Sequence, residues 1–173
     1  MRSTMAGLCL IAACSLPAAA QQHVHASPYA GQHRSEIPSL SPEELEQLRS
    51  GDGMGLARAA ELNHFPGPLH VLELADSLAL TSQQRQRITA IRQRMSEAAI
   101  RVGNQIIEKE RELNQRFAHA HIDAETLKQM TAEIARLQGE LRATHLLAHI
   151  ETTAVLQPAQ IQAYDRLRGY TDR

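Results

Sequence analysis

The sequence predicts an all-α protein built around one long antiparallel helical hairpin. Aromatic residues make up only 3% of the chain while 43% is hydrophobic, and a core of Ala, Leu and Ile is typical of packed helices. Proline is absent from residue 69 to residue 157. Within that stretch, apolar residues recur every three or four positions in two long runs, as they do on the buried face of a helix. Short helices are expected before this hairpin, and one short helix after it.

The first twenty residues have the features of an export signal. Arg2 precedes an apolar segment over residues 5–13, and the small residues at 17–20 predict cleavage after Ala20. Acylation of Cys14 as a lipoprotein is the alternative. Either route predicts a periplasmic protein. The apolar run is too short to cross a bilayer, and no later segment predicts a membrane span.

Cysteine content and charge exclude several classes of protein. Cys9 and Cys14 are the only cysteines, and both precede the predicted cleavage site. The mature chain is therefore expected to lack thiol catalysis, Cys-ligated zinc and disulfides. The formal net charge of −1 argues against nucleic acid as a partner. No pairing of a nucleophile with a base stands out, so we expect no enzymatic activity.

Three segments follow from the composition: a signal peptide over 1–20, a flexible His-containing arm over 21–40, and a single helical domain over 41–173. The arm lacks periodicity and contains Pro28, Gly31 and Pro38. Ser41 and Glu44 are spaced as a capping box, which predicts a helix to about residue 50. Two further short helices are predicted over 56–63 and 69–78.

The hairpin begins at a second capping box, formed by Thr81 and Gln84, which opens a helix to about Ala118. Asp123 is the expected N-cap of the returning helix. A last helix is predicted to start after 156–160 and to end near Gly169.

The two apolar runs match in an antiparallel register in which the numbers of opposite residues add to 243. This agreement predicts two paired helices about 50 Å long. The predicted pairs are Ile88/Val155, Ile91/Thr152, Met95/Ala148, Ala98/His145, Val102/Leu141, Ile106/Leu137 and Leu113/Met130.

Two Leu-x-x-x-Gln helix starts carry a resemblance to a known family. Residues 80–84 read Leu-Thr-Ser-Gln-Gln, which matches the LTxxQ motif, and residues 156–160 look like a second copy with Gln157 in place of Thr. Two copies about 75 residues apart, bracketing a helical hairpin behind an export signal, resemble the Spy/CpxP family over about residues 69–168. That family includes zinc-resistance-associated proteins and heavy-metal sensors. The motif residues here are Leu80, Thr81, Gln84, Leu156 and Gln160.

The resemblance implies an all-α, cradle-shaped homodimer. It also implies one of three activities: an ATP-independent chaperone for unfolded periplasmic proteins, a modulator of envelope stress that acts on a sensor kinase, or a heavy-metal sensor or buffer.

The first long helix favours the chaperone. Its apolar stripe has arginines along both flanks, and such a surface suits unfolded chains, which expose apolar and acidic groups. The alternative is an ordinary solvated helix surface with local ion pairs. The candidate client-binding residues are Arg85, Arg87, Arg92, Arg94, Arg101 and Met95.

Histidines favour metal binding instead. The chain has nine, and His145 and His149 lie one turn apart on one helix face, where neutral imidazoles suit Zn, Cu or Ni. The alternative for His145 is a core-edge position beside the small Ala98. Cleavage after Ala20 would place His23 third in the mature chain, a position at which Cu(II) or Ni(II) is held in a square plane, with His25 nearby. No cofactor is required, and the sequence leaves the chaperone and the metal-binding interpretations open.

Overall fold

A computed structural model of the chain describes residues 27–170. Residues up to Gly31 belong to a separate unit, of which the structure describes a turn closed by a 2.9 Å hydrogen bond from the Ala30 N–H to the Ser27 carbonyl. Residues 32–170 form one helical unit with no strand, so the predicted all-α fold is confirmed. None of the described helices is long and apolar enough to span a bilayer. The predicted signal peptide and Cys14 lie outside the described residues.

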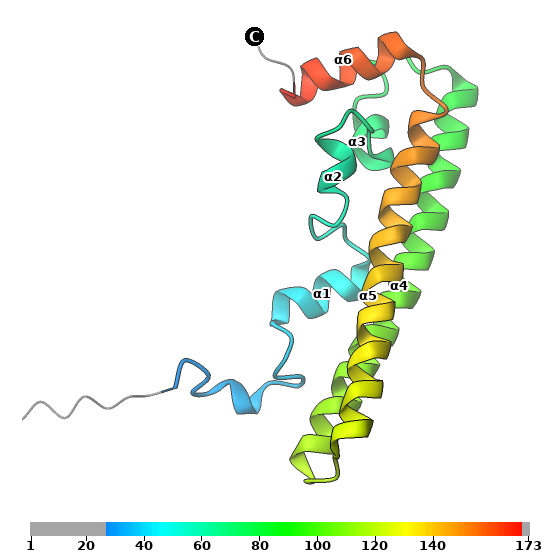
Figure 1. The fold of residues 1–173 in the computed structure, drawn as a ribbon. Coiled ribbons are helices and arrows are strands. Elements are labelled where there is room, and N and C mark those ends of the chain that lie inside the picture. Colours follow the sequence, from blue (N-terminus) through cyan, green and yellow to red (C-terminus); the bar gives the residue numbers. More distant parts are fainter. Residues whose placement is uncertain (1–26, 171–173) are drawn as a thin grey trace, which may run out of the picture. The chain divides into compact units, whose positions relative to one another are not determined.

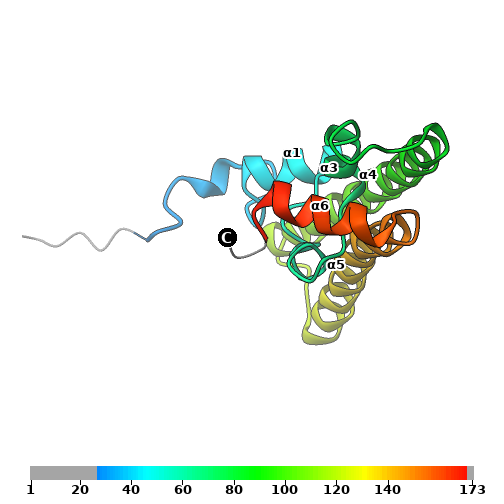
Figure 2. The same cartoon turned by 90° about the horizontal axis from the view of Figure 1, so that it is seen from above.

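The long helices α4 and α5 run side by side, and the shorter helices α1, α2 and α3 follow one side of this pair (Figure 1). The α6 helix leaves the open end of the hairpin on the side where α2 and α3 lie, as the view from above also shows (Figure 2). The elements are a short 3-10 helix at Gln32–Arg34, α1 (Pro42–Ser50), α2 (Arg58–Glu61), α3 (Pro68–Glu73), α4 (Ser82–Ala118), α5 (Ala124–Thr153) and α6 (Pro158–Arg168).

Both hairpin helices begin at the predicted caps. The Thr81 hydroxyl accepts from the Gln84 N–H at 3.2 Å, and the Gln84 side chain accepts from the Thr81 N–H at 3.0 Å. The Asp123 carboxylate accepts from the Thr126 N–H at 2.8 Å. With 37 and 30 residues, α4 and α5 are about 55 Å and about 45 Å long at 1.5 Å per residue. The predicted hairpin is confirmed in its bounds.

The predicted register agrees with the packing of the two helices. An ion pair of 2.7 Å joins Arg94 to Glu151, whose numbers add to 245, less than one turn from the predicted 243. Opposite residues of the predicted pairs also share the same two core clusters. The first holds Ile88, Ile91, Ala148 and Val155, and the second holds Val102, Ile106, Leu137 and Leu141.

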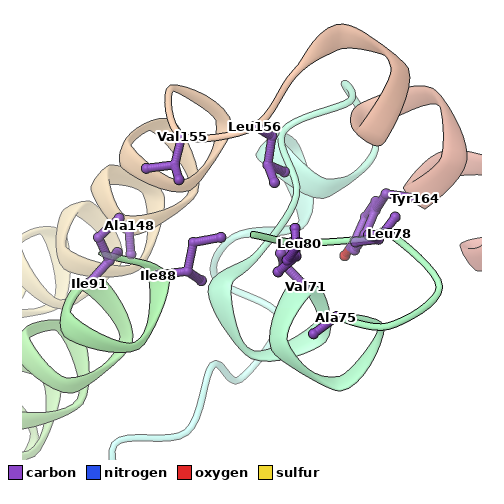
Figure 3. Close-up of a cluster of buried hydrophobic side chains, with 10 residues drawn as sticks. All are labelled: Val71, Ala75, Leu78, Leu80, Ile88, Ile91, Ala148, Val155, Leu156 and Tyr164. Atoms are coloured by element: carbon purple, nitrogen blue, oxygen red, sulfur yellow. The ribbon is translucent and has the colours of Figure 1, made fainter. Parts of the chain in front are cut away.

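The first core cluster lies at the open end of the hairpin, where α3, α4, α5 and α6 meet (Figure 3). Val71 of α3 and Tyr164 of α6 are almost completely buried there. Leu80 and Leu156, the leucines of the two motif copies, are buried in the same cluster. Burying an aliphatic or aromatic side chain of this size stabilises a fold by about 1.5–3 kcal/mol. The motif leucines therefore anchor both helix starts to one core.

The second core cluster forms where α1 crosses α4. Leu45 and Leu48 of α1 pack there against Val102 and Ile106 of α4. Gly103 permits this crossing, because a Cβ atom at that position would lie 2.2 Å from the Leu48 carbonyl oxygen. No side chain larger than hydrogen fits at that distance.

Part of the predicted flexible arm is packed against the helices. Ile37 is fully buried in the second core cluster. Glu36 forms ion pairs with Arg49 at 3.3 Å and with Arg111 at 2.8 Å. An arm reaching to residue 40 is therefore wrong for residues 36–40. The error arose because one apolar residue among polar ones has no periodicity to detect.

The two short helices after α1 end earlier than predicted. The α2 helix spans only Arg58–Glu61, inside the predicted 56–63, and α3 stops at Glu73 instead of continuing to residue 78. The observed ends are at the C-caps Leu62 and Leu74, whose φ angles are negative, and the positive φ angles of His64 and Ala79, 65° and 47°, come only after the predicted ends. Turns tied by single backbone hydrogen bonds replace the missing helical residues.

Candidate functional site

The glutamines of the two motif copies bind each other directly. The Gln84 amide nitrogen donates to the Gln160 oxygen at 2.8 Å, and the Gln160 nitrogen donates back to Gln84 at 3.2 Å. Each amide also donates to a backbone carbonyl, that of Val155 for Gln84 and that of Leu78 for Gln160. This reciprocal pair joins the start of α4 to the start of α6. The sequence predicted Gln84 only as a cap and did not predict the pair.

A cavity of about 710 Å³ lies in the helical unit, on the side of the hairpin that carries α2 and α3. Its walls come from the loop after α1, from α2 and the start of α3, from α4 and α5, and from the end of α6. Ionisable and sulfur-containing side chains dominate the lining. They are Asp52, Met54, Arg58, Glu61, His70, Arg92, Met95, His145, His149, Arg168 and Tyr170.

His145 and His149 of α5 line this cavity. His145 is 3% exposed, and its Nε2 atom has no hydrogen-bond partner. Burial lowers the pKa of His145 below its ordinary value, and the charge of His149 lowers it further, while Asp52 acts in the opposite direction. Burial therefore favours the neutral imidazole of His145, whose buried Nε2 has no hydrogen-bond partner among the described residues. An unpartnered buried nitrogen of this kind is rare in folded proteins.

A backbone carbonyl sets the tautomer of His149. Its Nδ1 lies 2.7 Å from the Phe65 oxygen, and a carbonyl oxygen can only accept, so Nδ1 carries the proton of the neutral ring. The lone pair is then on Nε2, which packs against Gly67: a Cβ atom at Gly67 would lie 3.0 Å from it. A carbonyl bonded to one ring nitrogen commonly orients a metal-ligating histidine.

Glu61 of α2 connects the wall of the cavity to α5 and to the C-terminal helix α6. Its Oε1 accepts hydrogen bonds from the hydroxyls of Tyr164 and of Tyr170, the latter at 3.0 Å, and it lies 3.6 Å from the Arg168 guanidinium. Its Oε2 lies 3.6 Å from Nδ1 of His149. Burial, and then the hydrogen bond to Glu61, raise the pKa of Tyr164, which keeps this hydroxyl protonated as a donor.

The sequence did not single out Glu61 or Tyr164 as site residues. A lone Glu in a four-residue helix and a lone Tyr in α6 have no spacing that would relate them. The one available signal was that His145 and His149 share a helix face.

The predicted client-binding residues are dispersed. Arg85 pairs with Asp76 at 2.5 Å and Arg94 with Glu151 at 2.7 Å. Arg92 and Met95 line the cavity, while Arg87 and Arg101 are exposed. The apolar stripe between these arginines is largely buried in the two core clusters, because α1, α3 and α5 cover it. The structure therefore does not show the predicted cation-edged apolar stripe as an exposed surface.

The remaining metal predictions have different outcomes. His23 and His25, with the predicted new N-terminus, lie outside the described residues. Within residues 27–170, no group of three or more His, Asp or Glu side chains is placed to hold a metal ion. A site at His145 and His149 would therefore draw further ligands from other residue types or from water.

A family model for heavy-metal resistance matches residues 54–163. The match covers more than half of the chain, so the chain belongs to the heavy-metal resistance family, which is related to Spy/CpxP-like helical proteins. The matched range contains both motif glutamines, Glu61 and the two cavity histidines. No curated protein and no solved structure matches the chain.

Proposed function

We propose that this chain is an exported metal-binding protein, a sensor or buffer for Zn, Cu or Ni, and that it binds the ion at His145 and His149. The observation that carries the proposal is the buried, unpartnered Nε2 of His145 in a cavity of about 710 Å³. Leaving such a nitrogen unpaired costs about 1–3 kcal/mol, and a bound ion would recover that cost. Membership of the heavy-metal resistance family supports the same function.

Two features suit these histidines to metal binding. They lie four residues apart, which places both rings on one face of α5. The lowered pKa of His145 also keeps its ring in the neutral form that binds metal near neutral pH. Because α2, α4, α5 and α6 all contribute to the wall, an ion at this point would stabilise their packing. Such coupling suits a sensor, whose surface must change with metal occupancy.

The proposal also includes a specific relationship of this chain to the Spy/CpxP proteins. It is supported by the two motif glutamines, which meet at 2.8 Å although 76 positions separate them in the chain. Export to the periplasm and homodimer formation go with that likeness.

The test is metal binding by equilibrium dialysis with Zn(II), Ni(II) and Cu(II). His145→Leu removes the ligand and fills the buried position with an apolar side chain, so the fold should survive. We expect this variant and His149→Leu each to lower the affinity for at least one of these ions tenfold or more. The double variant His119→Ala/His121→Ala, at the exposed hairpin tip, is the matched control. Unchanged affinity in both α5 variants would contradict the proposal.

A second variant tests the position of the ring rather than its presence. Gly67→Ala keeps both histidines, and the backbone there (φ −81°, ψ 145°) accepts alanine. The new Cβ would lie 2.8 Å from Cε1 of His149, so the ring must shift. We expect weaker metal binding with unchanged helical content by circular dichroism. Full affinity together with a native fold would show that the His149 ring need not be held in its present position.

One observation favours a second function, the binding of unfolded proteins. Leu147 and Ile150 of α5 are 56% and 53% exposed and lie three residues apart, so they form an apolar patch outside the hairpin core. The assay is suppression of aggregation of a chemically unfolded client, with and without EDTA. Protection that is indifferent to EDTA and lost in Leu147→Ser/Ile150→Ser would favour the chaperone over the metal-binding protein.

A further inference from the structure

Two methionines share the cavity with the histidines. Met54 belongs to the loop after α1 and Met95 belongs to α4, and both are partly buried. In the predicted hairpin register, Met95 lies opposite Ala148, between the levels of His145 and His149. Met95 of α4 and the two imidazoles of α5 therefore lie at neighbouring levels of the hairpin, and Met54 lines the same cavity from the loop.

Among the described residues, the acidic groups of the cavity do not form a preformed metal site with the two histidines. One oxygen of Glu61 is taken by the hydroxyls of Tyr164 and Tyr170 and by the Arg168 guanidinium. Asp52, the other carboxylate in the lining, is exposed. Within residues 27–170, no third His, Asp or Glu joins the two histidines as a preformed group. The nitrogen and sulfur donors of the lining that suit a soft ion are the imidazoles and the thioethers.

The charge of the lining also favours a monovalent ion. Three arginines, Arg58, Arg92 and Arg168, border the cavity against the two carboxylates Asp52 and Glu61, which leaves an excess of one positive charge. By Coulomb's law, the repulsion of a monovalent cation by this excess charge is half of that on a divalent cation at the same point. Thioether sulfur is a soft ligand that selects Cu(I), whereas carboxylate and water suit harder ions. The type of ligand and the charge of the lining therefore both favour a soft monovalent ion.

We infer that this cavity binds a monovalent coinage-metal ion, Cu(I) or Ag(I), through the sulfurs of Met54 and Met95 and the Nε2 atoms of His145 and His149. The inference rests on the proposed metal-binding function and names the class of ion. Only binding is involved, and the ion keeps its oxidation state. The thioethers select the soft ion, and the histidines serve every metal that the site takes.

The first test compares the full chain with Met54→Leu/Met95→Leu. Leucine for methionine conserves volume and is well tolerated in cores. Affinity for Cu(I) is measured under anaerobic reducing conditions by competition with a chromogenic Cu(I) chelator, and affinity for Ag(I) by direct titration. We expect the double variant to lose at least tenfold in affinity for both ions and to keep its affinity for Zn(II). Met130→Leu, near the hairpin tip and outside the cavity lining, is the control and should bind as the parent does.

The second test observes the ligands themselves. In the full chain labelled with 13C at the methionine methyl groups, and with signals assigned by single Met→Leu variants, Ag(I) should shift the signals of Met54 and Met95 and leave that of Met130 in place. Unshifted cavity methionines, or a double variant that binds Ag(I) as tightly as the parent, would overturn the inference.

The two proposals fail in different ways. If Zn(II), Ni(II) or Cu(II) binds through the histidines while Cu(I) and Ag(I) do not bind, only the inference on ion class is wrong. If His145→Leu and His149→Leu leave the binding of every ion unchanged, both proposals are wrong.

Discussion

At the scale of single residues, the side-chain amides of Gln84 and Gln160 join the start of α4 to the start of α6 at the open end of the helical hairpin. Each amide uses its oxygen and its nitrogen in hydrogen bonds within the protein. Because both side chains are only partly exposed, losing one of them leaves its former partners without full compensation by water.

A double-mutant cycle tests this pair. Gln84→Met and Gln160→Met should each lower the free energy of unfolding by about 1–3 kcal/mol, while the double variant should cost less than the two single changes together. The measurement is urea denaturation followed by circular dichroism. Simple additivity would show that the two amides are not coupled.

The buried imidazole of His145 predicts a dependence of stability on pH. Its pKa in the folded protein lies below the ordinary value of 6.5, so below about pH 6.5 the unfolded chain binds the proton more readily than the folded chain does. The free energy of unfolding should therefore fall as the pH decreases from about 6.5 toward the lowered pKa. The measurement is urea denaturation at pH 7.5 and at pH 5.5, without metal.

The control for this pH effect is His145→Leu, which lacks the titrating group and should lose less stability than the parent between the two pH values. The other histidines are common to both proteins and cancel in the comparison. An equal loss in parent and variant would mean that the His145 ring is not the group responsible.

At the scale of elements, replacing each of two helical glycines by alanine should change the stability of the protein in opposite directions. Gly103 contacts the backbone of α1, so Gly103→Ala should destabilise the protein by about 1–3 kcal/mol or more through overpacking. Nothing lies within 4 Å of a Cβ atom at Gly139, so Gly139→Ala should stabilise α5 by about 0.5–1 kcal/mol. Thermal denaturation compares the two. If both changes stabilise the protein, α1 does not cross α4 at Gly103.

Elements differ in how far the sequence predicts them. The starts of α1, α4 and α5 followed from Ser41, Thr81 and Asp123, because a capping side chain acts on its own next three residues. The pairing of α4 with α5 followed from two matching apolar runs. The ends of α2 and α3 did not, because the chain leaves the helix at Leu62 and Leu74, where neither a glycine nor a proline marks the end.

The candidate site was also predictable from the sequence only in part. The shared face of His145 and His149 follows from helical spacing alone. The closure of the cavity by Met54 of the loop after α1, Glu61 of α2 and Tyr170 after α6 depends on where three separate segments pack against the hairpin. No local sequence pattern predicts that packing. Within the site, residues close in the chain were predictable, and residues that come from separate elements were not.

At the scale of the whole molecule, the exposed patch of Leu147 and Ile150 predicts association with a second copy. Their exposed fractions of 56% and 53% leave an apolar strip on α5 that a homodimer would cover. We expect the parent to sediment as a dimer and Leu147→Glu/Ile150→Glu to sediment as a monomer with unchanged helical content. A parent that sediments as a monomer at micromolar concentration would contradict this prediction.

The most direct measurement for a metal-binding function is an anomalous difference map from crystals of the full chain grown with Zn(II), recorded on both sides of the zinc absorption edge. We expect a peak in the cavity about 2.0–2.1 Å from Nε2 of His145 and from Nε2 of His149, the usual zinc–nitrogen distance. A fully occupied zinc peak elsewhere on the molecule, with none beside these two atoms, would contradict the proposed site.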